Sequence, residues 1–181
     1  MYWAERLEDI LPRESAWTPR PPDWSEIEAT WGTRFPSDYI WFCETYGPGS
    51  INDFTGIFHP MSWVEARSTM VDATRTAQES FEDSKMSPVD RMLGVRGDPR
   101  LIAWGSSDLA DDFFWDAKEG NPDEWPIVVL FRDEFLWRQF DMSLSEFLVR
   151  ALLDELEGWE EPMVFDQPGQ NTFEPYPDTV I

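Results

Sequence analysis

The sequence predicts a single α+β domain with a mixed, mostly antiparallel sheet and helices packed on one face of that sheet. Three observations favour this fold class. Apolar residues recur at helical spacing in the first half of the chain, runs rich in aromatic and β-branched residues cluster between residues 100 and 140, and a helical pattern follows them. A regular βαβ protein would instead alternate strands and helices along its whole length, which this chain does not do.

Two helices are expected near the start of the domain. Asp23 and Glu26 form a capping-box pattern in front of a first helical repeat of apolar residues. Ser37 is expected to cap a second helix, which the Gly-Pro-Gly sequence at residues 47–49 ends. Cys43 lies on the apolar stripe of this second helix, so we interpret it as a buried packing residue rather than a reactive thiol.

Short strands and a long helix follow. Residues 50–58 predict one or two short strands. Ser62 and Glu65 form a second capping box, and the apolar stripe of the helix behind it continues to Phe81. Residues 100–105 then predict a strand, because a run of apolar residues is bounded there by a loop and a glycine.

Three further strands are expected between residues 112 and 140. The segments "DFFWD" (112–116), "WPIVVLF" (125–131) and "EFLWRQF" (134–140) are rich in aromatic and β-branched residues. Good turn-forming residues separate them, at 120–123 and at 132–134. Short turns join antiparallel neighbours, so these segments predict an antiparallel meander.

A last helix completes the folded domain. Ser143 and Glu146 form a third capping box in front of an apolar helical stripe. We divide the chain into an N-terminal extension of residues 1–22, an α+β domain of residues 23–157 and an acidic, proline-containing tail of residues 158–181. We expect the tail to be loosely packed.

The charge balance restricts the partners that this protein can take. The chain has 36 acidic and 14 basic residues and a formal net charge of -22. Such a charge repels nucleic acid and anionic membranes and attracts cationic partners, although solubility alone is an alternative explanation. The single cysteine rules out an internal disulfide, and the longest apolar run, residues 127–131, is too short for a membrane span. Since the first residues also lack a signal-peptide pattern, we expect a cytoplasmic protein without nucleic-acid or membrane partners.

Most catalytic and metal-binding arrangements are disfavoured. The one histidine, His59, lies next to a proline and is better explained as a structural or surface residue. One histidine and one cysteine are too few for a zinc site, and no glycine-rich loop precedes a helix in the way that a phosphate site requires. We therefore expect no catalytic residue, no cofactor and no metal. A hydrolase that uses a pair of carboxylates stays open, because the separation of two carboxylates is a three-dimensional property.

Residues 105–129 hold a conspicuous mixture of acidic and aromatic residues. A calcium loop is disfavoured there, because the stretch around Asp111 lacks the central glycine and contains bulky aromatic residues. The acids either form a solvated hairpin tip or face a positively charged partner. The partner-binding residues that the second hypothesis predicts are Asp108, Asp111, Asp112, Asp116, Glu119, Asp123, Glu124 and Trp125.

Three segments, taken in order, resemble the SUKH superfamily of Smi-/Knr-like proteins. They are "IEATWGTRFPSDYIWFCETYGPGSI" (27–51), "IAWGSSDLADDFFWDA" (102–117) and "FDMSLSEFLVRALL" (140–153). The resemblance covers about residues 24–153. The matching positions are Glu28, Phe35, Pro36, Asp38, Tyr39, Phe42 and Gly47 in the first segment, Gly105, Asp108, Phe114, Trp115 and Asp116 in the second, and Ser143, Glu146, Phe147 and Leu148 in the third.

The resemblance implies a SUKH-like α+β fold and a protein-binding function. Many bacterial members of the superfamily are immunity proteins that neutralise toxin domains of polymorphic or contact-dependent systems, whereas fungal relatives are regulatory scaffolds. It supplies no catalytic residue. We expect an immunity protein that is a monomer or weak homodimer. Its expected partner is a cognate, basic toxin domain that acts on nucleic acid. The alternatives are a regulatory scaffolding module and a carboxylate-only hydrolase.

Overall fold

The computed structural model describes residues 2–13, 22–60, 70–85, 92–95, 97–157, 159 and 171–176. In these segments the helices are α1 (Tyr2–Ile10), α2 (Trp24–Trp31), α3 (Ser37–Thr45), α4 (Met70–Lys85) and α5 (Leu144–Leu152), with a 3₁₀ turn η1 (Pro122–Glu124). The strands are β1 (Gly49–Ile51), β2 (Thr55–Ile57), β3 (Met92–Leu93), β4 (Leu101–Ser107), β5 (Asp112–Asp116), β6 (Ile127–Phe131), β7 (Leu136–Phe140) and β8 (Phe173–Pro175).

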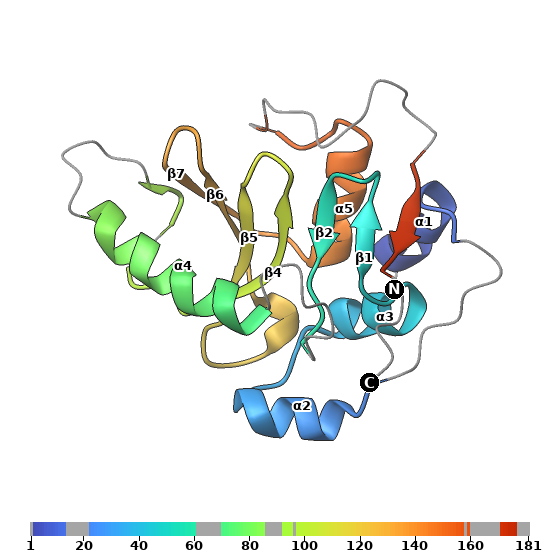
Figure 1. The fold of residues 1–181 in the computed structure, drawn as a ribbon, viewed down its shortest axis with the longest axis horizontal. Coiled ribbons are helices and arrows are strands. Elements are labelled where there is room, and N and C mark those ends of the chain that lie inside the picture. The colour runs from blue at the N-terminus through green and yellow to red at the C-terminus, as the bar shows by residue number, and fades with distance from the viewer. Residues whose placement is uncertain are drawn as a thin grey trace.

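The strands form one sheet in the order β3-β7-β6-β5-β4-β2-β1-β8 (Figure 1). Every neighbouring pair in it is antiparallel except β3 and β7, which run parallel. This mixed, mostly antiparallel sheet confirms the predicted α+β class. The predicted meander is also confirmed, because β5 pairs with β6 and β6 pairs with β7, both antiparallel.

Helices cover both faces of the sheet, which corrects the expectation that all of them pack on one face. Along β6, Ile127 and Val129 join a core shared with α1, α2, α3 and α5, whereas Val128 and Leu130 join a second core with Ala77 and Phe81 of α4. Alternate side chains of a strand point to opposite faces, so a continuous apolar run needs cover on both sides. The run at residues 127–131 was the sequence signal for the second layer.

The predicted caps of α2 and α5 are present. The Asp23 carboxylate accepts hydrogen bonds from the backbone N–H groups of Ser25 (3.0 Å) and Glu26 (3.3 Å). Ser143 Oγ accepts the N–H of Glu146 at 3.4 Å. Both contacts satisfy donors that the first turn of a helix otherwise leaves unpaired. The predicted capping box at residues 62–65 lies outside the described residues.

The expected cap of α3 is wrong. Pro36, not Ser37, occupies the capping position, and it has no side-chain acceptor. The acceptor comes instead from Asp123 in η1, whose Oδ1 lies 2.6 Å from the backbone nitrogen of Ser37. A sequence-local pattern cannot reveal this cap, because the two residues are 86 positions apart.

Both ends of the described chain join the same fold (Figure 1). Leu7 of α1 and the following Leu11 are fully buried, and Tyr46 Oη donates to the Leu11 carbonyl at 2.9 Å. At the other end β8 pairs with β1, so residues 171–176 form an edge of the sheet and not a loosely packed tail. No helix in the described segments has the length and apolarity needed to cross a membrane.

Candidate partner-binding site

The acidic residues predicted from residues 105–129 lie at the two ends of β5. Asp108, Asp111 and Asp112 lie at the turn between β4 and β5, whereas Asp116 ends β5. The remaining four residues lie in the connection from β5 to β6. A strand advances about 3.3 Å per residue, so β5 separates its two ends by about 13 Å.

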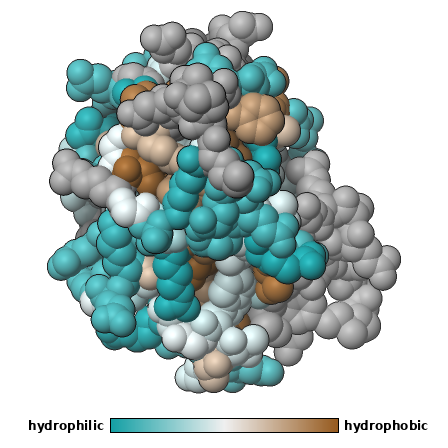
Figure 2. Space-filling model, turned by 90° about the vertical axis from the view of Figure 1, so that its left-hand side faces the viewer, coloured by the Kyte–Doolittle hydropathy of each residue, from teal (hydrophilic) through white to brown (hydrophobic). Residues whose placement is uncertain are grey.

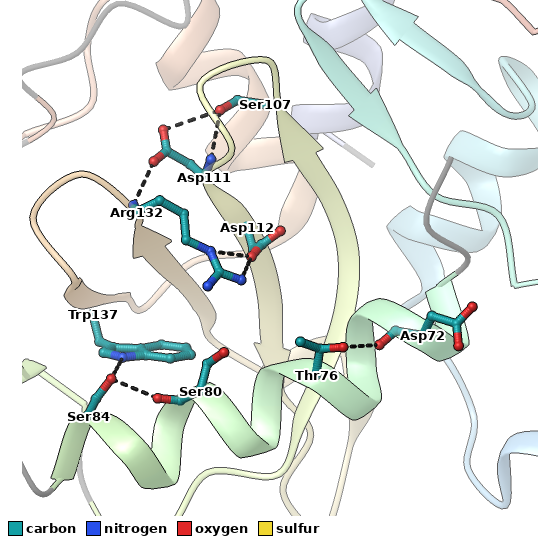
Figure 3. Close-up of polar contacts among 9 residues, drawn as sticks. All are labelled: Asp72, Thr76, Ser80, Ser84, Ser107, Asp111, Asp112, Arg132 and Trp137. Carbon is teal, nitrogen blue, oxygen red and sulfur yellow. Dashed lines mark hydrogen bonds and ion pairs between the residues drawn. The ribbon is translucent and has the colours of Figure 1, made fainter. Parts of the chain in front are cut away.

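Asp111 links two hairpin turns from a buried position. Its side chain is 7% exposed, and its Oδ2 lies 3.3 Å from Ser107 Oγ in the same turn. Its Oδ1 accepts the backbone N–H of Arg132, in the turn between β6 and β7, at 3.0 Å (Figure 3). The Asp111 carboxylate therefore holds the β4–β5 turn against the β6–β7 turn.

Asp112 reinforces this link. Its Oδ2 accepts the Nε–H of Arg132 at 2.9 Å and also forms an ion pair with Nη2 of the same guanidinium (Figure 3). Desolvation by burial raises the pKa of the Asp112 carboxyl, and the hydrogen bond and the charge of Arg132, which lower it, have smaller effects. The pair is thus partly withdrawn from water at the junction of the two turns.

Asp116, at the far end of β5, is fully buried. Its Oδ1 accepts the backbone N–H of Arg100 at 3.1 Å, and Lys118 Nζ lies 2.6 Å from its Oδ2. A buried carboxylate is stable only when charge and hydrogen bonds compensate its lost hydration, and both are supplied here. In the free protein Asp116 fastens the start of β4 to the end of β5.

The connection from β5 to β6 contains both structural and exposed residues. Asp123 is exposed yet caps α3, and Trp125 is 5% exposed with its indole N–H donating to the Lys118 carbonyl at 2.8 Å. Glu119 and Glu124 are exposed. The members of the predicted set that present side chains to solvent are therefore Asp108, Glu119, Asp123 and Glu124.

The three segments that carry the family resemblance contact one another. Asp38, at the start of α3, accepts the N–H (2.8 Å) and the hydroxyl (3.0 Å) of Ser145 in the first turn of α5. Tyr39 packs edge-to-face on Trp115 of β5, with ring centroids 4.8 Å apart. Asp38 and Tyr39 thus join the first segment to the third and to the second. These positions hold the fold together.

Sequence reasoning missed the arrangement of the hairpin turns. The turns at 52–54, 108–110 and 132–135 lie at the same end of the sheet (Figure 1). The backbone N–H of Asp108 donates to the Phe54 carbonyl at 3.0 Å, which joins the first two turns. Phe135 was expected inside a strand, but it lies in the turn with φ 50° and is 56% exposed. The only sequence signal was the acidic pair in front of it.

Cys43 and His59, the other side chains that could take part in chemistry, are buried or half-buried. Burial raises the pKa of the Cys43 thiol well above its ordinary value, and Cys43 is a free, buried cysteine. Within the described segments, no three His, Cys, Asp or Glu side chains are grouped in a way that could hold a metal ion. His59 is half-buried between β2 and α4.

Fold and site together define a strongly acidic α+β protein. The contacts of Asp38 and Tyr39 are structural, and the exposed acids of the predicted set lie on loops at the two ends of β5. A model of the SMI1 / KNR4 family (SUKH-1) matches residues 19–150, which is more than half of the 181 residues. The chain therefore belongs to the SMI1 / KNR4 family (SUKH-1). No match to this chain is found among the curated proteins or among the solved structures. Helix α1 and strand β8 lie outside the matched range.

Proposed function

We propose that this protein is an immunity protein, which binds a cognate toxin domain and neutralises it by stoichiometric inhibition without turnover. The observation that carries the proposal is membership of the SMI1 / KNR4 family (SUKH-1). The resemblance to the SUKH superfamily implies immunity proteins among its bacterial members. The buried carboxylates agree with a non-catalytic role, since Asp111 and Asp116 are both engaged in structural hydrogen bonds.

The toxin domain that we propose is a basic protein that acts on nucleic acid. Any protein that binds nucleic acid needs a basic surface to neutralise phosphates. The formal net charge of -22 would attract such a surface from a distance and would accelerate the encounter. Occupation of the basic surface by an acidic protein would then exclude the nucleic acid.

The predicted acidic residues have two roles in this proposal. Asp108, Glu119, Asp123 and Glu124 offer exposed carboxylates to the partner. The more buried members of the set position the loops that carry them; these are Asp111, Asp112, Asp116 and Trp125. The proposal also takes the protein to be a cytoplasmic monomer or weak homodimer; the single cysteine, which allows no internal disulfide, is common in reducing compartments.

The test first looks for a toxin gene next to the gene for this chain and then co-expresses the domain that it encodes with this protein. We expect growth of a bacterial host to be restored, and a one-to-one complex of the purified proteins to abolish the activity of the domain on nucleic acid. Complex formation that leaves the activity intact would favour a scaffolding function. A toxin domain that neither binds nor is inhibited by this protein would refute the proposal.

A further inference from the structure

Three hairpin turns form a continuous rim at one end of the sheet, and hydrogen bonds fasten them to one another. We call the turns at residues 52–54, 108–110 and 132–135 the hairpin rim (Figure 1). The contact from Asp108 N–H to the Phe54 carbonyl joins the first and second turns. The Asp111 carboxylate joins the second turn to the third through the N–H of Arg132. The rim is thus organised before any partner arrives, which lowers the entropic cost of binding.

The rim exposes apolar side chains at its tips. The large hydrophobic residues exposed in the described part of the chain are Tyr2, Val71, Leu93, Leu109 and Phe135. Leu109 (47% exposed) and Phe135 (56% exposed) both lie on the rim, in neighbouring turns. On the side that Figure 2 shows, the coloured hydrophobic residues form small areas in a mainly hydrophilic surface. Aromatic residues such as phenylalanine are enriched at protein interfaces, and Leu109 adds apolar area in the neighbouring turn.

The backbone conformation at Phe135 indicates that this exposed side chain is not there for the sake of the turn. Its φ of 50° lies in the left-handed region, which a bulky side chain rarely adopts. Ala110, beside Leu109, has a φ of 68°. Glycine or asparagine would form either turn with less strain, so the folding of this chain does not require a phenylalanine at position 135.

The charges on the rim select the kind of partner. Asp53, Asp108, Asp133 and Glu134 are exposed acidic residues on the three turns. The basic residue of these turns, Arg132, is paired with Asp112. A partner surface that fits the rim is therefore basic and offers an apolar contact for Leu109 and Phe135.

The dimensions of the rim suit a protein partner. Strands lie about 4.8 Å apart, so the midpoints of neighbouring hairpins in this sheet are about 10 Å apart and the three tips span about 20 Å. A standard protein interface buries about 800 Å² on each partner, which is a patch somewhat wider than this span. The rim is thus large enough for the centre of such an interface, whereas a small ligand would contact one turn only.

We propose that the hairpin rim is the docking surface for a basic protein domain, with Leu109 and Phe135 as its apolar anchors and the rim carboxylates as its steering charges. This inference rests on the proposed function, because it names the surface through which the toxin domain is bound. It moves the centre of binding from the β5–β6 connection to the opposite end of β5.

The experiment measures binding kinetics of the toxin domain encoded beside this chain, purified with an inactivating substitution. Phe135→Asn and Leu109→Ala are the test variants, since asparagine tolerates the left-handed backbone at 135. Val71→Ala (55% exposed) and Leu93→Ala (46% exposed) are the matched controls away from the rim. We expect the double rim variant to bind roughly tenfold or more weakly, mainly through faster dissociation, and each control to stay within about twofold of wild type.

A second arm tests the charges. Asp53→Asn, Asp108→Asn and Asp133→Asn together should slow association at low salt, and this loss should shrink as added salt screens the field. Thermal melting of every variant excludes misfolding. If the wild type binds the toxin domain and the rim variants bind it as tightly as the control variants do, the rim assignment alone is overturned. A wild-type protein that does not bind the toxin domain would overturn the proposed function, and the rim assignment with it.

Discussion

Asp123 offers a decisive test of the distinction between structural and partner-facing acids. Its Oδ1 lies 2.6 Å from the backbone nitrogen of Ser37, and Pro36 at the capping position has no side-chain acceptor to replace it. Replacing a helix cap by alanine typically costs about 0.5–2 kcal/mol, and a hydrogen bond to a charged acceptor contributes about 1.5–3 kcal/mol. Since Asp123 is exposed, we expect Asp123→Ala to lower the free energy of unfolding by about 1–2 kcal/mol.

The assay is thermal and urea unfolding followed by circular dichroism. For a chain of this size each kcal/mol shifts the melting temperature by about 2–4 °C, so the expected decrease is about 2–8 °C. Glu124→Ala is the matched control, because it removes the same charge from the next residue, which is also exposed. Equal stability of the Asp123→Ala and Glu124→Ala variants would refute the capping role and leave Asp123 as a surface acid only.

Three further predictions follow from buried groups. Gly49→Ala should destabilise the protein by about 1–3 kcal/mol and loosen β8, detected by hydrogen exchange, because a β-carbon there would lie 2.3 Å from the Phe173 ring. Cys43 should resist a thiol reagent in the native state and react on unfolding, since burial raises its pKa; rapid native labelling would contradict this. The raised pKa of Asp112 means that the folded state binds its proton more tightly, so stability should fall as pH rises from the ordinary carboxyl value through the folded-state value. Asp112→Asn should remove this part of the pH dependence, and an unchanged profile would count against it.

The elements that could be predicted are those specified by nearby residues. The turn residues at 120–123 and 132–134 predicted the antiparallel order of β5, β6 and β7, and Asp23 predicted the start of α2. Strand β8 could not be predicted in the same way. It has only three residues, one of which is a proline, and its partner β1 lies more than 100 positions earlier in the chain. Such a strand forms because the rest of the sheet offers a free edge, which is a tertiary property.

The candidate site was predictable in composition but not in arrangement. Asp111 and Asp112 are neighbouring aspartates in the sequence, yet Asp111 accepts the backbone N–H of Arg132, whereas Asp112 pairs with its guanidinium. Asp116 is fully buried, although the sequence analysis counted it among the acids that could face a partner. Which carboxylates stay exposed depends on the backbone groups and cations that the fold brings near them, and those come from distant residues.

Because some acids are structural and others are exposed, the same charge-neutralising substitution has a different meaning for binding at each position. Neutralising a buried acid such as Asp111 would disconnect the hairpin turns, so a resulting loss of binding would report on the shape of the rim and not on a contact. Neutralising Asp108 or Asp133 would leave these hydrogen bonds in place and would report on steering alone. Long-range attraction depends on the summed field of all 36 acidic residues, so each exposed acid contributes only part of it. The apolar tips are different, because Leu109 and Phe135 act only at contact. If the hairpin rim binds the toxin domain as we propose, the rate of dissociation depends mainly on the tips, whereas the rate of association depends on the charge.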